Sequence, residues 1–278
     1  MRSQADKGAR FRALHARAGA FIIPNPYDPG TARLLQHVGF EAIATTSAGC
    51  AYSIGQLDNT VGRDRMMAYV AAIAAATDLP VSADLENGYG DDPETVAETV
   101  RRAAAAGLAG CSIEDDSQRA EERIYELAHA VERVRAAVEA ARSLPFPFTL
   151  TARAENFIAG RPDLADTIQR LQAYQDAGAD VLFAPGLATG DDIAAVVRAI
   201  DRPLNVVMGL PGVHFNLEEL ARLGVKRVSV GGSLTRAALG AFLRAARELR
   251  EHGTFGYVKD AVSSRELGDA FGADNAES

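Results

Sequence analysis

Acidic residues gather at two points of the sequence where a short apolar run ends. Asp84 and Glu86 close one run, and the segment Glu114-Asp115-Asp116 closes the next. If both runs are strands, residues two apart face the same side, so Asp84 and Glu86 point together. Clustered carboxylates suit Mg²⁺ or Mn²⁺, which prefer oxygen ligands and share their shell with a substrate oxygen. The other interpretation is that these acids only cap the next helix or bond the glycine-rich turn.

A cation and an acid stand two residues apart in a later run. Arg153 and Glu155 would share one face of a strand. Arg153 could hold a substrate carboxylate through two parallel hydrogen bonds, and Glu155 could orient a metal-bound water or the arginine itself. A structural ion pair is the alternative. Because a buried charge without a ligand is costly, the pattern favours a functional role.

Two further segments carry weaker signals. The small residues at 45–51 would let backbone amides approach an anion, although they are also ordinary loop material. Asp58 follows in a polar stretch, where on its own it would be assigned to a surface turn. Neither segment identifies a ligand by itself.

These residues need a scaffold that brings strand ends together, and the chain alternates strand and helix patterns throughout. The alternation predicts eight strands, at 21–24, 42–46, 80–85, 111–114, 148–153, 181–184, 204–208 and 228–231. Eight units predict an α/β protein with a (β/α)8 barrel of the TIM type, although an open doubly wound sheet uses the same alternation. In either fold the chemistry lies beyond the carboxyl ends of the strands.

The expected junctions agree with this alternation. Four glycines stand between a helical pattern and the next strand, where a left-handed cap favours glycine: Gly39, Gly107, Gly178 and Gly224. Asp92 followed by Pro93 predicts a helix start, and Asn216 with Glu219 fits a capping box.

The composition limits the class of protein. The 278 residues carry a formal net charge of -8, which argues against nucleic acid as the main partner. We find no secretory signal and no apolar segment long enough to span a membrane, and therefore expect a cytoplasmic protein without a membrane partner. Cys50 and Cys111 give neither a disulfide framework nor a zinc spacing. We expect one barrel domain at 1–255, a helical extension and tail at 256–278, and a disordered end at 272–278.

Together, these motifs resemble the isocitrate lyase and phosphoenolpyruvate mutase superfamily from about residue 21 to residue 255. Asp84-Leu85-Glu86-Asn87-Gly88-Tyr89-Gly90 is similar to its Asp-x-Asp-x-Gly-[Tyr/Phe]-Gly metal motif, with glutamate in place of the second aspartate. Ile113-Glu114-Asp115 resembles its Glu-Asp element, and Thr151-Ala152-Arg153-Ala154-Glu155 its Ala-Arg-x-[Glu/Asp] strand.

The resemblance implies roles for particular residues. It implies that Asp84 lies nearest Mg²⁺, that Glu86 and Glu114 belong to the water-mediated shell, and that Arg153 binds the substrate carboxylate beside Glu155. It also implies that Asp58 reaches the metal site from its loop. The implied substrate contacts are Tyr27, Thr46, Ser47, Ala48 and Asn205.

Two departures from the family pattern narrow the activity. The lyases carry a Lys-[Lys/Arg]-Cys-Gly-[His/Arg] loop after the fourth strand, but the corresponding segment at 115–122 has no cysteine. After the sixth strand, Pro185-Gly186-Leu187 replaces Pro-Glu-Ala. These differences argue against isocitrate or methylisocitrate cleavage and leave a core that binds Mg²⁺ with a planar oxo acid.

We therefore expect a Mg²⁺-dependent lyase that breaks a carbon-carbon bond of a small 2-oxo acid or substituted dicarboxylate and passes through a pyruvate enolate. One alternative is a carbon-phosphorus mutase or hydrolase, for which Arg119 would face the phosphonyl group. Another is a noncatalytic protein that binds an oxo acid such as 2-oxoglutarate. The resemblance also implies a homodimer or homotetramer in which the C-terminal helix is exchanged between subunits.

Overall fold

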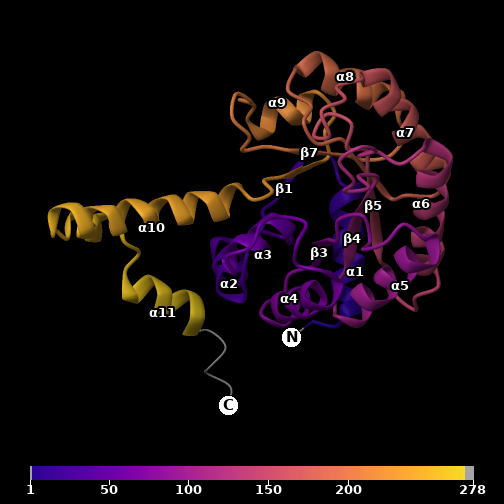
Figure 1. Ribbon diagram of the computed structural model, residues 1–278. Coiled ribbons are helices and arrows are strands. Elements are labelled where there is room, and N and C mark those ends of the chain that lie inside the picture. Colours follow the sequence, from indigo (N-terminus) through magenta and orange to yellow (C-terminus); the bar gives the residue numbers. More distant parts are fainter. Residues whose placement is uncertain (1, 273–278) are drawn as a thin grey trace.

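Eight short parallel strands form a barrel at the centre of the computed structural model, which describes residues 2–272 (Figure 1). They are β1 (Phe21–Ile23), β2 (Ile43–Ala44), β3 (Val81–Asp84), β4 (Gly110–Glu114), β5 (Thr149–Arg153), β6 (Val181–Phe183), β7 (Leu204–Val207) and β8 (Arg227–Ser229). They pair in the order β1-β8-β7-β6-β5-β4-β3-β2, and Ala44 N–H donates to Pro24 O across the remaining seam at 3.0 Å. The predicted (β/α)8 barrel is confirmed.

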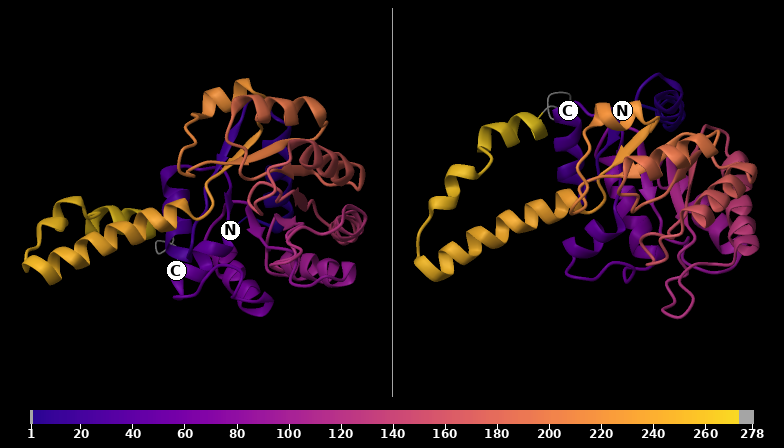
Figure 2. Two further views of the ribbon diagram at one scale, coloured as in Figure 1. Left: turned by 45° about the horizontal axis from the view of Figure 1, so that its top comes forward. Right: turned by 90° about the horizontal axis from the view of Figure 1, so that it is seen from above.

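Helices between the strands cover the outside of the barrel (Figures 1 and 2). They are α2 (Pro29–Val38), α3 (Ser47–Ser53), α4 (Arg63–Ala75), α5 (Pro93–Ala105), α6 (Leu127–Arg142), α7 (Leu164–Asp176), α8 (Gly190–Ala199) and α9 (Leu217–Arg222). An additional helix, α1 (Gln4–Ala16), precedes the first strand and packs its Phe11 against β1 and the core. None of the helices in residues 2–272 combines the length and apolar character needed to cross a membrane.

The predicted helix ends are present. The four junction glycines adopt left-handed φ values of 97°, 89°, 103° and 92° at Gly39, Gly107, Gly178 and Gly224. The Asp92 side chain accepts from Glu94 N–H at the start of α5, and Asn216 and Glu219 form the reciprocal capping box of α9. The glycines therefore mark where helices end, and the two caps mark where α5 and α9 begin.

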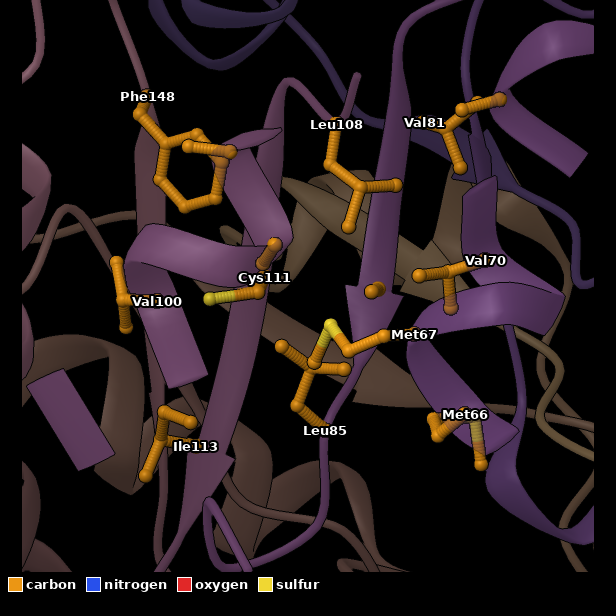
Figure 3. Close-up of a cluster of buried hydrophobic side chains, with 14 of the residues drawn as sticks. Met66, Met67, Val70, Val81, Leu85, Val100, Leu108, Cys111, Ile113 and Phe148 are labelled. Carbon is orange, nitrogen blue, oxygen red and sulfur yellow. The ribbon is translucent and has the colours of Figure 1, made fainter. Parts of the chain in front are cut away.

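Apolar side chains fill the space between the strands and the outer helices. Figure 3 shows one cluster, in which Met67 of α4 lies beside Leu85 and Val100 of α5 lies beside Cys111 and Ile113 of β4. Each fully buried side chain of this size contributes roughly 1.5–3 kcal/mol of transfer free energy. Cys111 lies inside the cluster, where burial raises the pKa of its thiol well above the usual value, so it is a packing residue.

The inside of the barrel contains several polar residues, whereas bulky branched residues commonly fill such barrels. Ser82, Ser112, Asn205, Arg227 and Ser229 all line one internal cavity, and each is less than 9% exposed. Because side chains alternate along a strand, the apolar residues between them face the outer helices instead. Polar residues therefore stand inside the barrel beside apolar ones such as Ile23, Phe183 and Val207, which line the same cavity.

The C-terminal arm, residues 233–272, leaves the barrel. Helix α10 (Ser233–His252) projects away from it, the short helix η1 (Gly256–Asp260) turns the chain, and α11 (Ser264–Gly272) runs back to α2 (Figure 2). The departure comes at Ser233, within the predicted 1–255 domain. Residues 273–278, on which most of the predicted disordered end falls, lie outside the described residues. Helix exchange between subunits stays a prediction.

Candidate active site

The site is a cavity of about 190 Å³ that opens at the carboxyl ends of the strands and reaches into the barrel. Asp84, Arg153 and Glu155 line its upper part, and Asn205 and Arg227 line the deeper part. Pockets for drug-sized ligands are typically about 300–1,000 Å³, so a cavity of this size favours a small metabolite.

Arg153 stands at the centre of a group of carboxylates. Its Nη1 lies 2.8 Å from Asp84 Oδ1 and 3.1 Å from Glu114 Oε2, and its Nε donates to Glu155 Oε1 at 2.8 Å. Its Nη2 makes no hydrogen bond with any residue in the 2–272 range. Phe183 packs under the guanidinium with its ring centre 5.0 Å away. The remaining donor edge of Arg153 is therefore available to an anion in the cavity.

The charges of this group do not balance. Burial raises the pKa of Glu114, and it raises that of Glu155 to about 7, while the Arg153 cation works in the opposite direction. Three carboxylates and one guanidinium would carry excess negative charge if all were ionised. The electrostatics therefore favour a bound cation, which would keep the acids ionised.

Glu86 lies to one side of this group rather than within the cavity. It has a left-handed φ of 51°, it is only 3% exposed, and its Oε2 accepts from Gln118 Nε2 at 2.9 Å. Its Oε1 has no hydrogen-bond partner within the described chain, and burial raises its pKa to about 7. Arg133 fixes the turn by donating to the carbonyls of Asn87, Gly90 and Asp91.

The small-residue run forms a helix, α3, rather than the loop that its composition suggests. Thr46 caps its start, and the Ser47 amide and hydroxyl donate to Asp84 Oδ2 at 3.2 and 3.1 Å. Asp58 is close enough that burial and the charge of Asp84 both raise its pKa, while hydrogen bonding to Ser47 lowers it. Asp58 and Ser47 therefore meet beside Asp84.

The remaining residues predicted for the site differ in whether they line the cavity. Tyr27, Thr46 and Ala48 are not among the residues that line the cavity, whereas Asn205 lies deep within it and bonds Ser229. Asp115 turns away from the site, where Tyr174 and Arg170 donate to it at 2.6 and 3.1 Å. Its role is to hold the next strand end, because its other oxygen accepts from Glu155 N–H at 2.8 Å.

Sequence reasoning missed two polar residues of the cavity. Asn25 bridges the seam of the barrel, donating to Thr45 O and accepting from the amides of Val230 and Gly231. Arg227 lies in the floor. The strand predicted at 228–231 began one residue too late to include Arg227, which is the first residue of β8.

The loop after β4 closes on itself. Asp116 pairs with Ile124 as an antiparallel bridge, and Ser117 N–H donates to Arg123 O at 2.6 Å. Arg119 donates to Asp91 Oδ2 at 2.6 Å and is half exposed, so it does not line the cavity. The loop contributes Gln118 to Glu86 and no cation to the cavity.

The donor chemistry fits a hard divalent cation in part. Asp84 and Glu114 meet at Arg153, and Glu86 offers an unpartnered buried oxygen. Within residues 2–272, however, no three His, Cys, Asp or Glu side chains converge closely enough to hold a metal alone. Mg²⁺ commonly uses one or two carboxylates and fills its shell with waters and substrate oxygens, so these residues suit it.

Comparison with known proteins places the chain among enzymes of one superfamily. Residues 11–250 match the model of the phosphoenolpyruvate phosphomutase family. The chain is 30% identical to an oxaloacetate decarboxylase of Chromohalobacter salexigens (90% of this chain, 87% of the relative) and 29% identical to a 2-methylisocitrate lyase of Shewanella oneidensis (93% and 90%). A solved structure of a candidate lyase/mutase from Burkholderia cenocepacia J2315 is 63% identical, with a TM-score of 0.95 over 98% of this chain and 97% of that one.

Proposed function

The chain belongs to the phosphoenolpyruvate phosphomutase family, within the isocitrate lyase and phosphoenolpyruvate mutase superfamily, and from this premise we propose that it is a Mg²⁺-dependent carbon-carbon lyase. Its substrate is a small 2-oxo acid or substituted dicarboxylate, with oxaloacetate decarboxylation as the simplest case. The observation that carries the proposal is Arg153, held by Asp84, Glu114 and Glu155 with a free donor edge at a small cavity.

Arg153 binds and orients the carboxylate next to the oxo group. Glu155 holds its Nε, which fixes the plane of the guanidinium, and Phe183 covers one face and excludes water. Asp84 and Glu114 would hold Mg²⁺, with Asp58 and Glu86 beside them. When bound, this ion supplies Lewis-acid stabilisation of the charge that develops on the oxo oxygen.

Decarboxylation makes the smallest demand on the residues present. The bond between the third carbon and its carboxylate breaks, CO₂ leaves, and the electron pair remains as the enolate of pyruvate, which takes a proton from water. Retro-aldol cleavage would need a group that moves a proton on the leaving fragment, and the loop at 115–122 has no cysteine to do so. The relative named oxaloacetate decarboxylase supports the same choice.

Carbon-phosphorus chemistry is the weaker candidate. It would need a cation facing the phosphonyl group, but Arg119 is paired with Asp91 away from the cavity. A protein that only binds an oxo acid would keep the same arrangement around Arg153. A turnover assay distinguishes such a protein from an enzyme.

We also propose that a second copy of the chain covers the C-terminal arm. Phe242 and Phe255 are each 69% exposed, and Leu243, Val258 and Val262 are about half exposed. An apolar surface of this kind usually marks a protein interface. Helix exchange within a dimer or tetramer would bury it.

A Mg²⁺-dependent pyruvate-release assay tests the activity. We would offer oxaloacetate, substituted malates, methylisocitrate and phosphonopyruvate to the wild type, to Asp84→Ala and to Glu132→Ala, which removes an exposed acid of α6. We expect turnover of oxaloacetate that is lost in Asp84→Ala and kept in Glu132→Ala. Binding of an oxo acid without turnover of any of these substrates would contradict the lyase and favour a sensor.

A further inference from the structure

Arg227 is a buried cation in the floor of the cavity. The residue is 4% exposed, and it lies among the cavity-lining residues with its neighbours Asn205 and Ser229. Its Nε donates to Asn205 Oδ1 at 2.8 Å, and its Nη2 donates to Thr151 Oγ1 at 3.0 Å. Both of these acceptors are neutral.

The third contact of Arg227 is neutral as well. Its Nη1 lies 3.5 Å from Nε2 of His15, whose Nδ1 lies 2.8 Å from Phe11 O. Burial first, and the Arg227 charge second, lower the pKa of His15 to about 3. The imidazole is therefore uncharged at neutral pH, donates to Phe11 O and offers only a lone pair to Arg227.

No carboxylate of residues 2–272 lies within 4.0 Å of the Arg227 guanidinium, whereas Arg153 has three such partners. The other buried arginines are compensated too: Arg170 pairs with Asp115 and Asp166, and Arg133 binds three carbonyls over the Tyr125 ring. Burial and the charge of Arg153 lower the pKa of Arg227 to about 9, so it stays protonated near neutral pH. A buried charge without a counter-ion is destabilising, which calls for an anion that the chain does not provide.

We propose that Arg227 is the subsite for the distal carboxylate of the substrate and selects a dicarboxylate over a monocarboxylate. The inference rests on the proposed function, in which Arg153 binds the carboxylate beside the oxo group. A guanidinium has five N–H donors and three are engaged, so two remain for a carboxylate in the cavity. Serine hydroxyls at Ser82 and Ser112 line the same cavity and leave room there.

A pair of matched ligands tests the proposal without any mutation. Malate and 2-hydroxybutyrate share the first carboxylate and hydroxyl, and they differ only in a carboxylate or methyl group at the far end. Titration calorimetry of the wild type with Mg²⁺ should show at least about tenfold tighter binding of malate, because only malate has a second carboxylate that can accept hydrogen bonds from the charged guanidinium. Equal affinity for the two ligands would overturn the proposal.

Variants test whether Arg227 causes the preference for malate. Arg227→Gln should bind both ligands equally, Arg227→Lys should keep part of the preference for malate, and affinity for 2-hydroxybutyrate should stay within about threefold in both. Lys226→Gln, which removes the neighbouring surface cation, is the control and should keep the full preference. A preference for malate that survives in a folded Arg227→Gln protein contradicts the role proposed for Arg227. If Arg227→Gln does not fold, the affinities of Arg227→Lys and of the wild type for the two ligands test the proposal instead.

The same titrations separate this inference from the proposed function. If wild-type protein turns over oxaloacetate but binds malate and 2-hydroxybutyrate equally, only the Arg227 subsite falls. If it binds neither ligand and turns over no oxo acid, both proposals fall.

Discussion

The barrel and the C-terminal arm use polar and apolar residues in opposite ways. The barrel keeps Arg153, Glu155 and Arg227 inside and packs its apolar residues between strands and helices. In the arm, Thr235 is the one residue of α10 below 9% exposure, while Phe242 is 69% exposed. Burial of apolar surface is the main stabilisation of a fold. The barrel therefore has its own core, whereas the arm leaves apolar side chains exposed, which is the basis of the proposed interface.

The largest expected effect lies inside the barrel. Arg153→Lys keeps a positive charge but loses the planar pair of donors, so the substrate carboxylate would no longer be oriented. We expect kcat/KM for oxaloacetate to fall roughly a thousandfold, in the range seen when one well-placed donor is removed. Steady-state pyruvate release measures it.

Its control is Arg142→Lys, which alters an arginine that pairs with Asp180 on the outside of the barrel. Activity of Arg153→Lys within tenfold of the wild type would show that Arg153 is only a structural counter-ion for its three acids.

In the arm the largest effect should fall on assembly. Phe242→Asp places a charge in the proposed apolar interface, and we expect the dissociation constant of the oligomer to rise about a hundredfold, as for a central aromatic contact. Sedimentation velocity over a concentration series measures it, with Arg250→Gln on the same helix as the control. A monomeric wild type would refute the proposed interface outright.

The buried His15 should make the stability of the barrel depend on pH. The pKa of His15 is about 3 in the fold, against 6.5 without it, so acid protonates the unfolded chain first. The stability that the fold gains from keeping His15 neutral is fully present above pH 6.5 and is lost as the pH falls toward 3.

Replacement by glutamine removes the titration. We expect the free energy of unfolding of the wild type to fall by about 3 kcal/mol relative to that of His15→Gln between pH 7 and pH 4. Urea unfolding at each pH measures it. Parallel pH curves for wild type and His15→Gln would exclude a buried neutral imidazole.

Local sequence signals were sufficient for most of the barrel. Apolar runs and junction glycines such as Gly178 place strands and helix ends within a few residues, because these depend on neighbours in sequence. The meeting of Asp84, Glu114 and Arg153 followed from a general property of parallel strands, whose carboxyl ends share one rim.

The remaining features depend on contacts between distant segments. Arg227 meets His15 only because α1 docks on the barrel, 212 residues away in sequence. The periodicity of α10 predicts a helix, but its direction depends on what covers it, so a packed eighth helix and a projecting arm have the same pattern. The 45–51 run was ambiguous because its residues are small enough for a loop or a helix.

The smallest effect compares two helix ends of the same geometry. Gly39 ends α2 on the barrel with φ 97°, Gly253 ends α10 in the arm with φ 63°, and a Cβ at either position meets no atom within 4 Å. Alanine at each site therefore carries backbone strain without a clash, about 1 kcal/mol. Gly39→Ala should lower the free energy of unfolding of the barrel by that amount. Gly253→Ala should leave barrel unfolding nearly unchanged in dilute protein and act on assembly instead, whereas equal losses in urea unfolding of the monomer would show that arm and barrel unfold as one unit.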